Sequence, residues 1–293
     1  MRITTENIFL KECIITSVRS FFGEKGFTEV FPTRIGPLSF AKSDADSENL
    51  FSLKYYNNED YFLAQTSQNL LEKYASELGK CYAVVPCYRR QKSRHTQGLS
   101  EYWSIEAAWE NDSIDSIIET TEAMFHSIYN SLVSMKKGGA WKIDWLSKEY
   151  GIAEAGNSAE GNHLGYVVKS RINSSDWTLG RDDNNRELVK SVSFVYSELT
   201  SPLQLLSGGV RNTDCDDINV RFEKALRQAG CTDFDEAKKS YKWYFDFKEN
   251  CNKTLCGFGL GIERLMMCIL NCNDIVNVCD IDDDSIVMRP SVK

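Results

Sequence analysis

The sequence lacks several features that define common classes of protein. Its 293 residues contain no apolar run near the roughly 18 residues that a membrane-spanning helix needs. The first residues lead into an amphipathic stretch and not into the apolar core of a signal peptide, so we expect a cytoplasmic protein without membrane contact. Its ten cysteines form no Cys-x-x-Cys pair, which signals neither a zinc ribbon nor a thioredoxin-type site and predicts reduced, mostly buried thiols.

Positive charge and histidine are also scarce. The 34 Lys and Arg residues are outnumbered by 42 Asp and Glu residues, which gives a formal net charge of −8. Such a surface works against broad binding to a phosphate backbone, although it is compatible with a local basic site. The three histidines, at positions 95, 126 and 163, give no convincing Ser-His-Asp or Cys-His arrangement, and we interpret His126 and His163 as ordinary polar residues.

Apolar periodicity predicts helices and strands that are mixed without a repeated βαβ order. We predict helices over residues 8–22, 68–78, 113–135 and 222–228. We predict strands over 27–32, 82–88, 102–110 and 192–196, a hairpin over 50–64, and a glycine-rich strand that runs into a helix over 257–267. Ser67 is the predicted N-cap of its helix. The fold class that follows is α/β (α+β), with a mostly antiparallel sheet flanked by helices.

The chain has no linker or composition break that would divide it. A length of 293 residues allows two domains or one large one, and we predict a single domain over residues 1–293. The stretch 154–186 is rich in Gly, Asn, Ser and Asp and is predicted to form loops, with a loop-rich insertion around 150–190.

A basic loop lies between two of the predicted strands. Residues 89–95 carry four fixed positive charges and a histidine. Guanidinium forks hold phosphate oxygens in bidentate geometry, so this loop suits a polyphosphate, although an isolated basic turn is also typical of a solvated surface. The strand that follows contains Tyr102, Trp103 and Glu106, an aromatic platform and a carboxylate. Together these segments offer contacts for a phosphate chain, an aromatic base and an amine.

Gly257, Gly259 and Gly261 mark a second segment of interest. The third glycine comes too early for a Gly-x-Gly-x-x-Gly dinucleotide fingerprint, so nucleotide binding and close packing of strand on helix both remain open. Arg264 follows this strand closely. In combination with the basic loop, Arg264 would reach a triphosphate from the opposite side.

Three segments, in order along the chain, resemble the motifs of class II aminoacyl-tRNA synthetases. Residues 257–265 look like motif 3 in its asparaginyl form, and residues 88–91, 94–95 and 100–106 are similar to motif 2. Residues 26–32 resemble motif 1, the dimer-forming element. The similarity spans residues 8–285 and implies a catalytic core of the asparaginyl/aspartyl type, with ATP and an amino acid as substrates, Mg²⁺ as cofactor and a homodimer as the assembly.

The resemblance implies a set of ATP-binding residues: Arg89, Arg94, His95, Tyr102, Gly259, Gly261 and Arg264. Arg89 would hold the α-phosphate of ATP and the α-carboxylate of the amino acid, and Arg89 and Arg264 would be the catalytic residues. Arg264 would also hold the β- and γ-phosphates, together with Arg94 and His95. Tyr102 would stack on adenine.

A further set of residues would bind the amino acid. Ser67 and Gln68 are similar to the Gln-Ser-x-Gln element that lines the family's amino-acid pocket. Glu106 would receive the substrate's α-amino group, and Arg211 would read a carbonyl or carboxylate of its side chain. A cationic fork with fixed acceptors selects a small zwitterion with an oxygen-bearing side chain.

The sequence departs from the family pattern at positions that bear on the substrate and the metal. Leu71 stands where aspartyl enzymes carry a lysine, which favours asparagine or another neutral side chain over aspartate. Gln91 and Gln204 replace two expected carboxylates, and glutamine is a much poorer Mg²⁺ ligand than glutamate. Glu198 lies near the other expected metal-ligand position, so Glu198 and Gln204 define at most a weak Mg²⁺ site.

The acceptor of the activated amino acid completes the expected function. The motifs begin near the amino terminus and leave no room for the β-barrel that reads the anticodon in this subgroup, and the net charge of −8 also argues against tRNA. We therefore predict an AMP-forming ligase that activates asparagine, aspartate or a close analogue and passes the acyl group to ammonia or an amine. Two alternatives stay open: a catalytically impaired paralogue with a binding or regulatory role, and tRNA aminoacylation without an anticodon domain.

Overall fold

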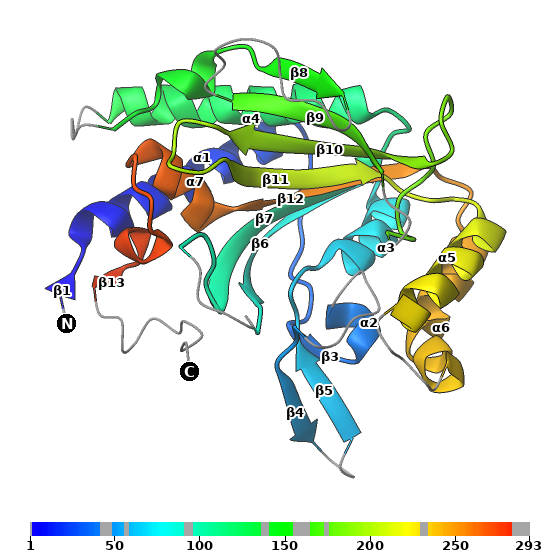
Figure 1. Cartoon of the computed structure of the whole chain (residues 1–293). Coiled ribbons are helices and arrows are strands. Elements are labelled where there is room, and N and C mark those ends of the chain that lie inside the picture. Colours follow the sequence, from blue (N-terminus) through cyan, green and yellow to red (C-terminus); the bar gives the residue numbers. More distant parts are fainter. Residues whose placement is uncertain are drawn as a thin grey trace.

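An eight-stranded sheet crosses the centre of the computed structural model, which describes residues 2–41, 49–55, 59–90, 96–135, 141–154, 165–172, 176–228 and 234–282 (Figure 1). The strands run in the order β2 (Thr28–Glu29), β6 (Lys80–Tyr88), β7 (Glu101–Glu110), β12 (Leu255–Gly261), β11 (Leu203–Val210), β10 (Leu188–Tyr196), β9 (Gly165–Ile172) and β8 (Gly151–Glu154). Neighbouring strands are antiparallel except at the two edges, where β2 pairs with β6 and β8 pairs with β9 in parallel. The prediction of a mostly antiparallel sheet is confirmed.

Two smaller sheets account for the remaining strands. β4 (Ser52–Tyr55) and β5 (Glu59–Leu63) form the predicted hairpin, which pairs with β3 (Ile35–Gly36) and projects from the body of the molecule in Figure 1. The tip of this hairpin lies outside the described residues. β1 (Arg2–Ile3) pairs with β13 (Ile281–Asp282), so the two ends of the described chain lie side by side.

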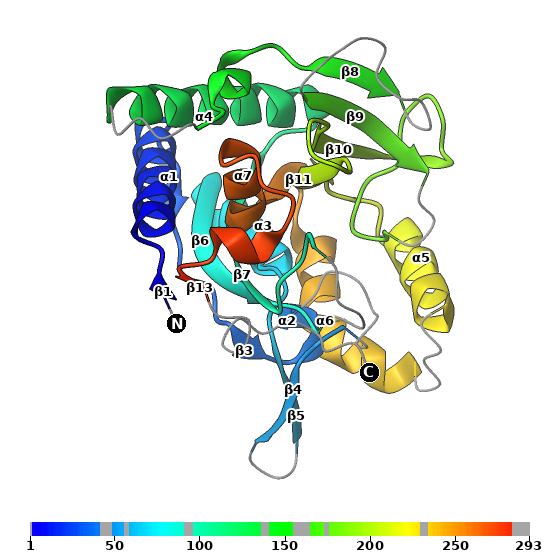
Figure 2. The same ribbon diagram turned by 60° about the vertical axis from the view of Figure 1, so that its left-hand side comes forward.

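Helices cover both faces of the large sheet (Figures 1 and 2). One apolar cluster joins the sheet to α1 (Thr5–Glu24), α4 (Ile114–Ser134) and α7 (Ile262–Ile269), together with the 3-10 turns η1 (Asp144–Ser147) and η2 (Ile275–Val278). A second cluster joins it to α3 (Gln68–Leu78), α5 (Cys215–Gln228) and α6 (Phe234–Asn250), near the short helix α2 (Leu38–Ala41).

Alternation along the central strands explains why there are two clusters. On β6, Tyr82 belongs to the cluster of α1, α4 and α7, whereas Ala83 belongs to the cluster of α3, α5 and α6. On β12, Phe258 is fully buried in the first cluster. Because successive side chains of a strand point to opposite faces, Gly259 opens on the other face, opposite Glu106 of β7. The candidate site lies on this face, where small and polar residues replace the apolar cluster around Gly259 and Glu106.

Most predicted elements are present in the structure. The helix predicted over residues 68–78 has those bounds, and the other predicted elements differ mainly at their ends. The largest difference is α5, which begins at Cys215 and not at Phe222. Asp214 explains the earlier start, because its carboxylate accepts hydrogen bonds from the backbone N–H groups of Asp216 and Asp217 at 3.1 and 3.0 Å.

The prediction of loops over residues 154–186 is wrong for β9, which occupies Gly165–Ile172. Backbone hydrogen bonds pair this strand with β10 on one side and β8 on the other. Such pairing with distant segments cannot be predicted from the local amino-acid composition. Helix α6 and strand β11 have no counterpart among the predicted elements. The single-domain organisation and the insertion around 150–190 stay predictions.

The described helices and cysteines bear on the expectations from composition. No helix in the described part of the chain is both long and apolar enough to cross a bilayer. None of the nine described cysteines forms a disulfide, and five are buried: Cys13, Cys81, Cys87, Cys256 and Cys268. Burial raises the pKa of the Cys81 thiol to about 12, so this thiol stays protonated at neutral pH.

Substitution of Leu10 tests whether α1 packs against the core. Its side chain is fully buried, whereas that of Leu78 at the end of α3 is 49 % exposed. We expect Leu10→Ala to lower the free energy of unfolding by about 2–5 kcal/mol and Leu78→Ala to lower it by less than about 1 kcal/mol, because only the first substitution leaves a cavity. Urea unfolding followed by circular dichroism measures both losses, and equal losses would contradict the assignment.

Candidate active site

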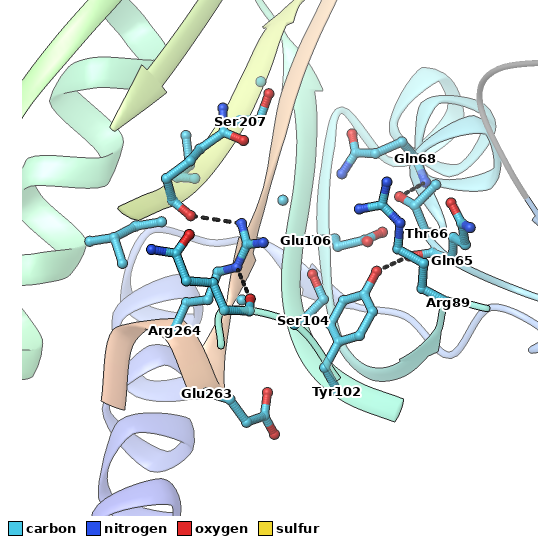
Figure 3. Close-up of a pocket in the computed structure, with 18 of the residues that line it drawn as sticks. Gln65, Thr66, Gln68, Arg89, Tyr102, Ser104, Glu106, Ser207, Glu263 and Arg264 are labelled. Atoms are coloured by element: carbon cyan, nitrogen blue, oxygen red, sulfur yellow. Dashed lines mark hydrogen bonds between the residues drawn. The ribbon is translucent and has the colours of Figure 1, made fainter. Parts of the chain in front are cut away.

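A cavity of about 300 Å³ opens on the face of the sheet that α3 covers, beside the first turn of that helix (Figure 3). Its lining comes from segments that are far apart in the sequence. It includes nine residues that the sequence analysis singled out: Gln68, Arg89, Tyr102, Glu106, Gln204, Arg211, Gly259, Gly261 and Arg264. The segments that resemble motifs 2 and 3 therefore meet around one cavity.

The floor of the cavity is the bare backbone of β12. A Cβ atom added at Gly259 or Gly261 would lie 3.7 Å from its nearest protein atom, so packing of the protein against itself does not require either glycine. A Cβ added at Gly257, by contrast, would lie 2.5 Å from the Ala107 carbonyl oxygen. Close packing therefore accounts for Gly257, whereas it does not account for Gly259 and Gly261, and nucleotide binding by this segment stays a prediction.

Arg264 and Arg89 bring positive charge to the cavity from opposite sides in the view of Figure 3. Arg264, in the first turn of α7, donates from Nε to the Gln97 carbonyl at 3.2 Å and from Nη1 to the Gln204 carbonyl at 2.9 Å. Burial lowers the pKa of Arg264, and the charge of Arg89 acts in the same direction. An anion between the two guanidinium groups would relieve their repulsion.

Tyr102 and Glu263 fix the wall between these arginines. The Tyr102 hydroxyl donates to the Gln65 carbonyl at 3.0 Å, and burial raises its pKa, so the hydroxyl stays protonated. Glu263 accepts a hydrogen bond from the Trp103 backbone N–H at 2.9 Å and forms an ion pair with Lys11 of α1, also at 2.9 Å. These contacts tie the start of α7 to β7 and to α1.

Glu106 is the buried carboxylate of the cavity. Its Oε2 accepts a hydrogen bond from the Ser67 backbone N–H at 2.6 Å. Arg34 lies behind these groups, donating to Ser67 Oγ and, at 2.9 Å, to the Pro86 carbonyl. Burial raises the pKa of Glu106, and the charge of Arg34 opposes this rise. Arg34 is not among the residues predicted from the sequence, because no motif links it to Glu106.

Ser67 corrects a detail of the predictions. It occupies the position before α3, as predicted, but its side chain makes no capping hydrogen bond. Its hydroxyl accepts from Arg34 instead. A charged donor makes a stronger hydrogen bond than the backbone N–H of a helix, so the charged partner wins. Ser67 does not itself line the cavity, but it positions Glu106.

Arg211 directly follows β11, whereas Arg264 contacts the carbonyl of Gln204 near the other end of that strand. Its Nη2 donates to Gln68 Oε1, and Gln68 Nε2 donates in turn to the Phe258 carbonyl at 2.7 Å. Its Nε lies 3.3 Å from Glu72 Oε1. Leu71 is fully buried in the apolar cluster of α3, α5 and α6 and is not part of the cavity lining. The preference for a neutral side chain that was inferred from Leu71 stays a prediction. Its neighbour Glu72, and not Leu71, faces Arg211.

Two residues of the predicted ATP site, Arg94 and His95, lie outside the described residues. The predicted metal ligands are placed by the structure, and they do not fit a Mg²⁺ site. Glu198 is not part of the cavity lining, and its carboxylate accepts a hydrogen bond from the Tyr196 hydroxyl at 3.1 Å. Gln204 lines the cavity, but its amide donates to a serine hydroxyl on β10 at 2.9 Å. No group of three or more His, Cys, Asp or Glu side chains could hold a metal within the described ranges.

Comparison with known proteins decides the family. Residues 2–280 match the family described as tRNA synthetases class II (D, K and N). The chain belongs to this class II family. The class II chain is 24 % identical over 299 residues to the asparagine–tRNA ligase of Pyrococcus abyssi, and 23 % identical over 311 residues to a probable cytoplasmic asparagine–tRNA ligase of Encephalitozoon cuniculi. In both comparisons 91 % of this chain is covered, and it spans 65 % of the length of the relative.

Solved structures show the same fold as this class II chain. The asparaginyl-tRNA synthetase of Pyrococcus horikoshii in complex with asparaginyl-adenylate matches with a TM-score of 0.78 and 20 % identity, covering 98 % of this chain and 70 % of that one. The Entamoeba histolytica asparaginyl-tRNA synthetase matches with a TM-score of 0.76 and 20 % identity, covering 98 % of this chain and 69 % of that one. The predicted class II fold is confirmed.

The two kinds of glycine on β12 give a matched test of the cavity floor. We expect Gly259→Ala to fold like the unchanged protein but to weaken ATP binding roughly tenfold to hundredfold, because an extra methyl group in a fitted site costs about 1–3 kcal/mol. We expect Gly257→Ala to lose stability instead, because its Cβ would lie 2.5 Å from a backbone oxygen. Calorimetric titration with ATP and thermal unfolding measure the two effects. Unchanged ATP affinity in Gly259→Ala would remove β12 from the nucleotide site.

Proposed function

We propose that this chain catalyses the ATP-dependent activation of asparagine, aspartate or a close analogue, with an aminoacyl-adenylate and pyrophosphate as products. The observation that carries the proposal is the meeting of Arg89 and Arg264 with Glu106 and Arg211 around one cavity. Guanidinium groups suit a triphosphate, and a carboxylate opposite a further guanidinium suits a small zwitterion. Both substrates of an adenylation would then lie in the same enclosure.

In the proposed reaction an oxygen of the substrate α-carboxylate attacks the α-phosphorus of ATP. The bond from that phosphorus to the oxygen bridging the β-phosphate breaks, and pyrophosphate leaves with the electron pair. Arg89 neutralises charge on the α-phosphate, and Arg264 holds the leaving pyrophosphate, with Arg94 and His95 assigned to the same task by resemblance. Catalysis then consists of positioning and charge stabilisation, and it requires no protein nucleophile.

Different residues would bind the two substrates. Tyr102 and the bare backbone of β12 would hold adenine between an aromatic ring and a flat floor. Ionised Glu106 would bind the α-ammonium group, since it is buried and carries the negative charge that this group requires. Arg211, which Gln68 holds in place, would donate to an oxygen of the substrate side chain.

The acceptor of the acyl group is tested in two arms. The relatives named above are asparagine–tRNA ligases, so tRNA is the first acceptor to test. The expectation of ammonia or an amine rested on the position of the motifs and on the net charge of −8, and neither the fold nor the comparisons add support to it.

We also propose a homodimer. Phe31, in the segment that resembles motif 1, is 81 % exposed, which suits a side chain that a second copy covers.

Exchange of labelled pyrophosphate into ATP tests the activation step. In the presence of Mg²⁺, we expect exchange that depends on asparagine, aspartate or an analogue. Arg89→Ala and Arg264→Ala should each reduce it by at least about a hundredfold, since losing one charge-stabilising donor costs that much. Arg227→Ala, an exposed arginine on α5, is the matched control and should stay within about twofold. Absence of exchange with every amino acid would favour the impaired paralogue with a binding role.

The acceptor follows from a second measurement on the same protein. Labelled amino acid that appears on tRNA identifies tRNA aminoacylation, whereas a labelled amide formed with ammonia or an amine identifies the other acceptor. Transfer to neither would leave the activated acyl group without an acceptor and contradict the ligase proposal.

Glu106 makes substrate binding depend on pH. Burial raises its pKa, so its carboxylate gains a proton at a higher pH than an exposed glutamate does. We expect the KM for the amino acid to rise as pH falls through this raised pKa, because protonated Glu106 no longer attracts the ammonium group. Glu106→Gln should raise that KM at least about thirtyfold at neutral pH and remove its pH dependence. Exchange assays from about pH 5 to 8 measure this, and a flat KM profile in the unchanged protein would contradict the role of Glu106.

A further inference from the structure

A group of buried charged residues lies directly behind Arg211. Glu72 of α3 and Tyr244 of α6 have no exposed surface, and Lys248 of α6 is 6 % exposed. The Lys248 Nζ lies 2.7 Å from Glu72 Oε2, and the Tyr244 hydroxyl donates to the same oxygen at 2.8 Å. The other oxygen, Glu72 Oε1, lies 3.3 Å from Arg211 Nε. One carboxylate therefore faces two cations, of which only Arg211 reaches the cavity.

The charges of this group do not cancel. Arg211 and Lys248 are cations and Glu72 is an anion, so the group carries one net positive charge. Tyr244 adds none, because burial raises the pKa of its hydroxyl and keeps it protonated. Without Lys248, Glu72 would pair with Arg211 alone, and the net charge would fall to zero. Buried charges interact through a low dielectric, so a ligand against Arg211 would sense that difference.

The surroundings of Lys248 give it no other partner of opposite charge among the described contacts. Its Nζ lies over the rings of Tyr244 and Phe247, at 5.4 and 5.7 Å from their centres, and its ion pair is with Glu72. Burial of an ammonium group costs free energy unless the group is paired, so the buried position of Lys248 needs an explanation. Holding Glu72 provides one. Asp176 also lines the cavity and accepts a hydrogen bond from the Thr178 hydroxyl. Its charge is the same in every variant described below, so it does not contribute to the differences between them.

We propose that Lys248 is a positioning residue that sets the preference of this site for the substrate's side chain. Lys248 takes up the charge of Glu72 and so leaves Arg211 as a net cation that donates to a side-chain oxygen. Its presence shifts the preference toward an anionic carboxylate and away from a neutral carboxamide. The proposal rests on the amino-acid site of the proposed function, and it extends that function to the residue that controls selectivity.

The experiment compares charge at position 248 with charge at a matched position. Lys248→Met removes the charge and keeps an unbranched apolar chain, whereas Lys248→Arg keeps the charge. Lys242→Met is the control, because Lys242 lies on the same helix, is exposed and pairs only with Asp246 among the described residues. Calorimetric titration gives the dissociation constants of aspartate and asparagine for each variant, and pyrophosphate exchange gives the KM of the amino acid and of ATP.

We expect Lys248→Met to weaken aspartate relative to asparagine by about tenfold, with the KM for ATP within about twofold, because the nucleotide end of the cavity keeps its charges. Lys248→Arg and Lys242→Met should leave the ratio of the two dissociation constants within about threefold. An unchanged ratio in Lys248→Met, or an equal change in Lys248→Arg, would overturn the proposal, since a residue that only supports the fold would alter both amino acids alike.

A double variant keeps the test decisive where Lys248→Met folds poorly. Glu72→Gln combined with Lys248→Met removes one charge of each sign and restores the single net charge on Arg211. We expect the ratio of dissociation constants to return to within about threefold of the unchanged protein, and failure to return would overturn the proposal. Because titration does not depend on catalysis, absence of exchange in the unchanged protein would refute adenylation alone, while the ratios would still judge the role of Lys248.

Discussion

The pairing of β7 with β12 is the constraint on which the rest of the site depends. Its register places Gly259 opposite Glu106, and the same register sends Phe258 and Ile105 into the apolar cluster under α1, α4 and α7. A slip of β12 by one residue against β7 would turn the side chains of β12 to the opposite faces of the sheet and bring Phe258 into the cavity. The apolar packing on one face of the sheet therefore fixes the register of β7 and β12, and this register positions the cavity residues on the opposite face.

The ionic side of the site follows a different rule. Each buried carboxylate at the amino-acid end has a cation fixed behind it, since Arg34 stands behind Glu106 and Lys248 stands beside Glu72. A buried charge without a partner costs several kcal/mol, so these cations allow the carboxylates to remain in the interior. The cavity thus presents fixed charges that need little rearrangement when a ligand arrives, which is the arrangement that electrostatic catalysis requires. These four residues come from the segment before β3, from β7, from α3 and from α6, and only the folded chain brings them together.

The sequence predicts those parts of the molecule whose signals are local. Helix α3 could be predicted with its bounds because its apolar spacing ends at Gly79, which adopts a positive φ of 80°. Residues that resemble known motifs also fall on the cavity. The remainder depends on contacts between distant segments: β9 exists through its ladders, and Lys248 meets Glu72 only when α6 packs against α3. Similarity to a motif does not tell which of two neighbouring helical residues faces the site. Leu71 packs in the apolar cluster, whereas Glu72, the next residue, pairs with Arg211.

The two edges of the large sheet have a consequence for the behaviour of the protein at high concentration. The edge strands β2 and β8 contain two and four residues. An edge strand exposes a row of N–H and C=O groups on which another polypeptide can extend the sheet, and the length of that row limits how firmly a foreign strand can dock. Edges this short offer little template for stacking of sheets between molecules. As far as the structure describes them, the two outer strands therefore give a foreign strand only two and four residues on which to pair.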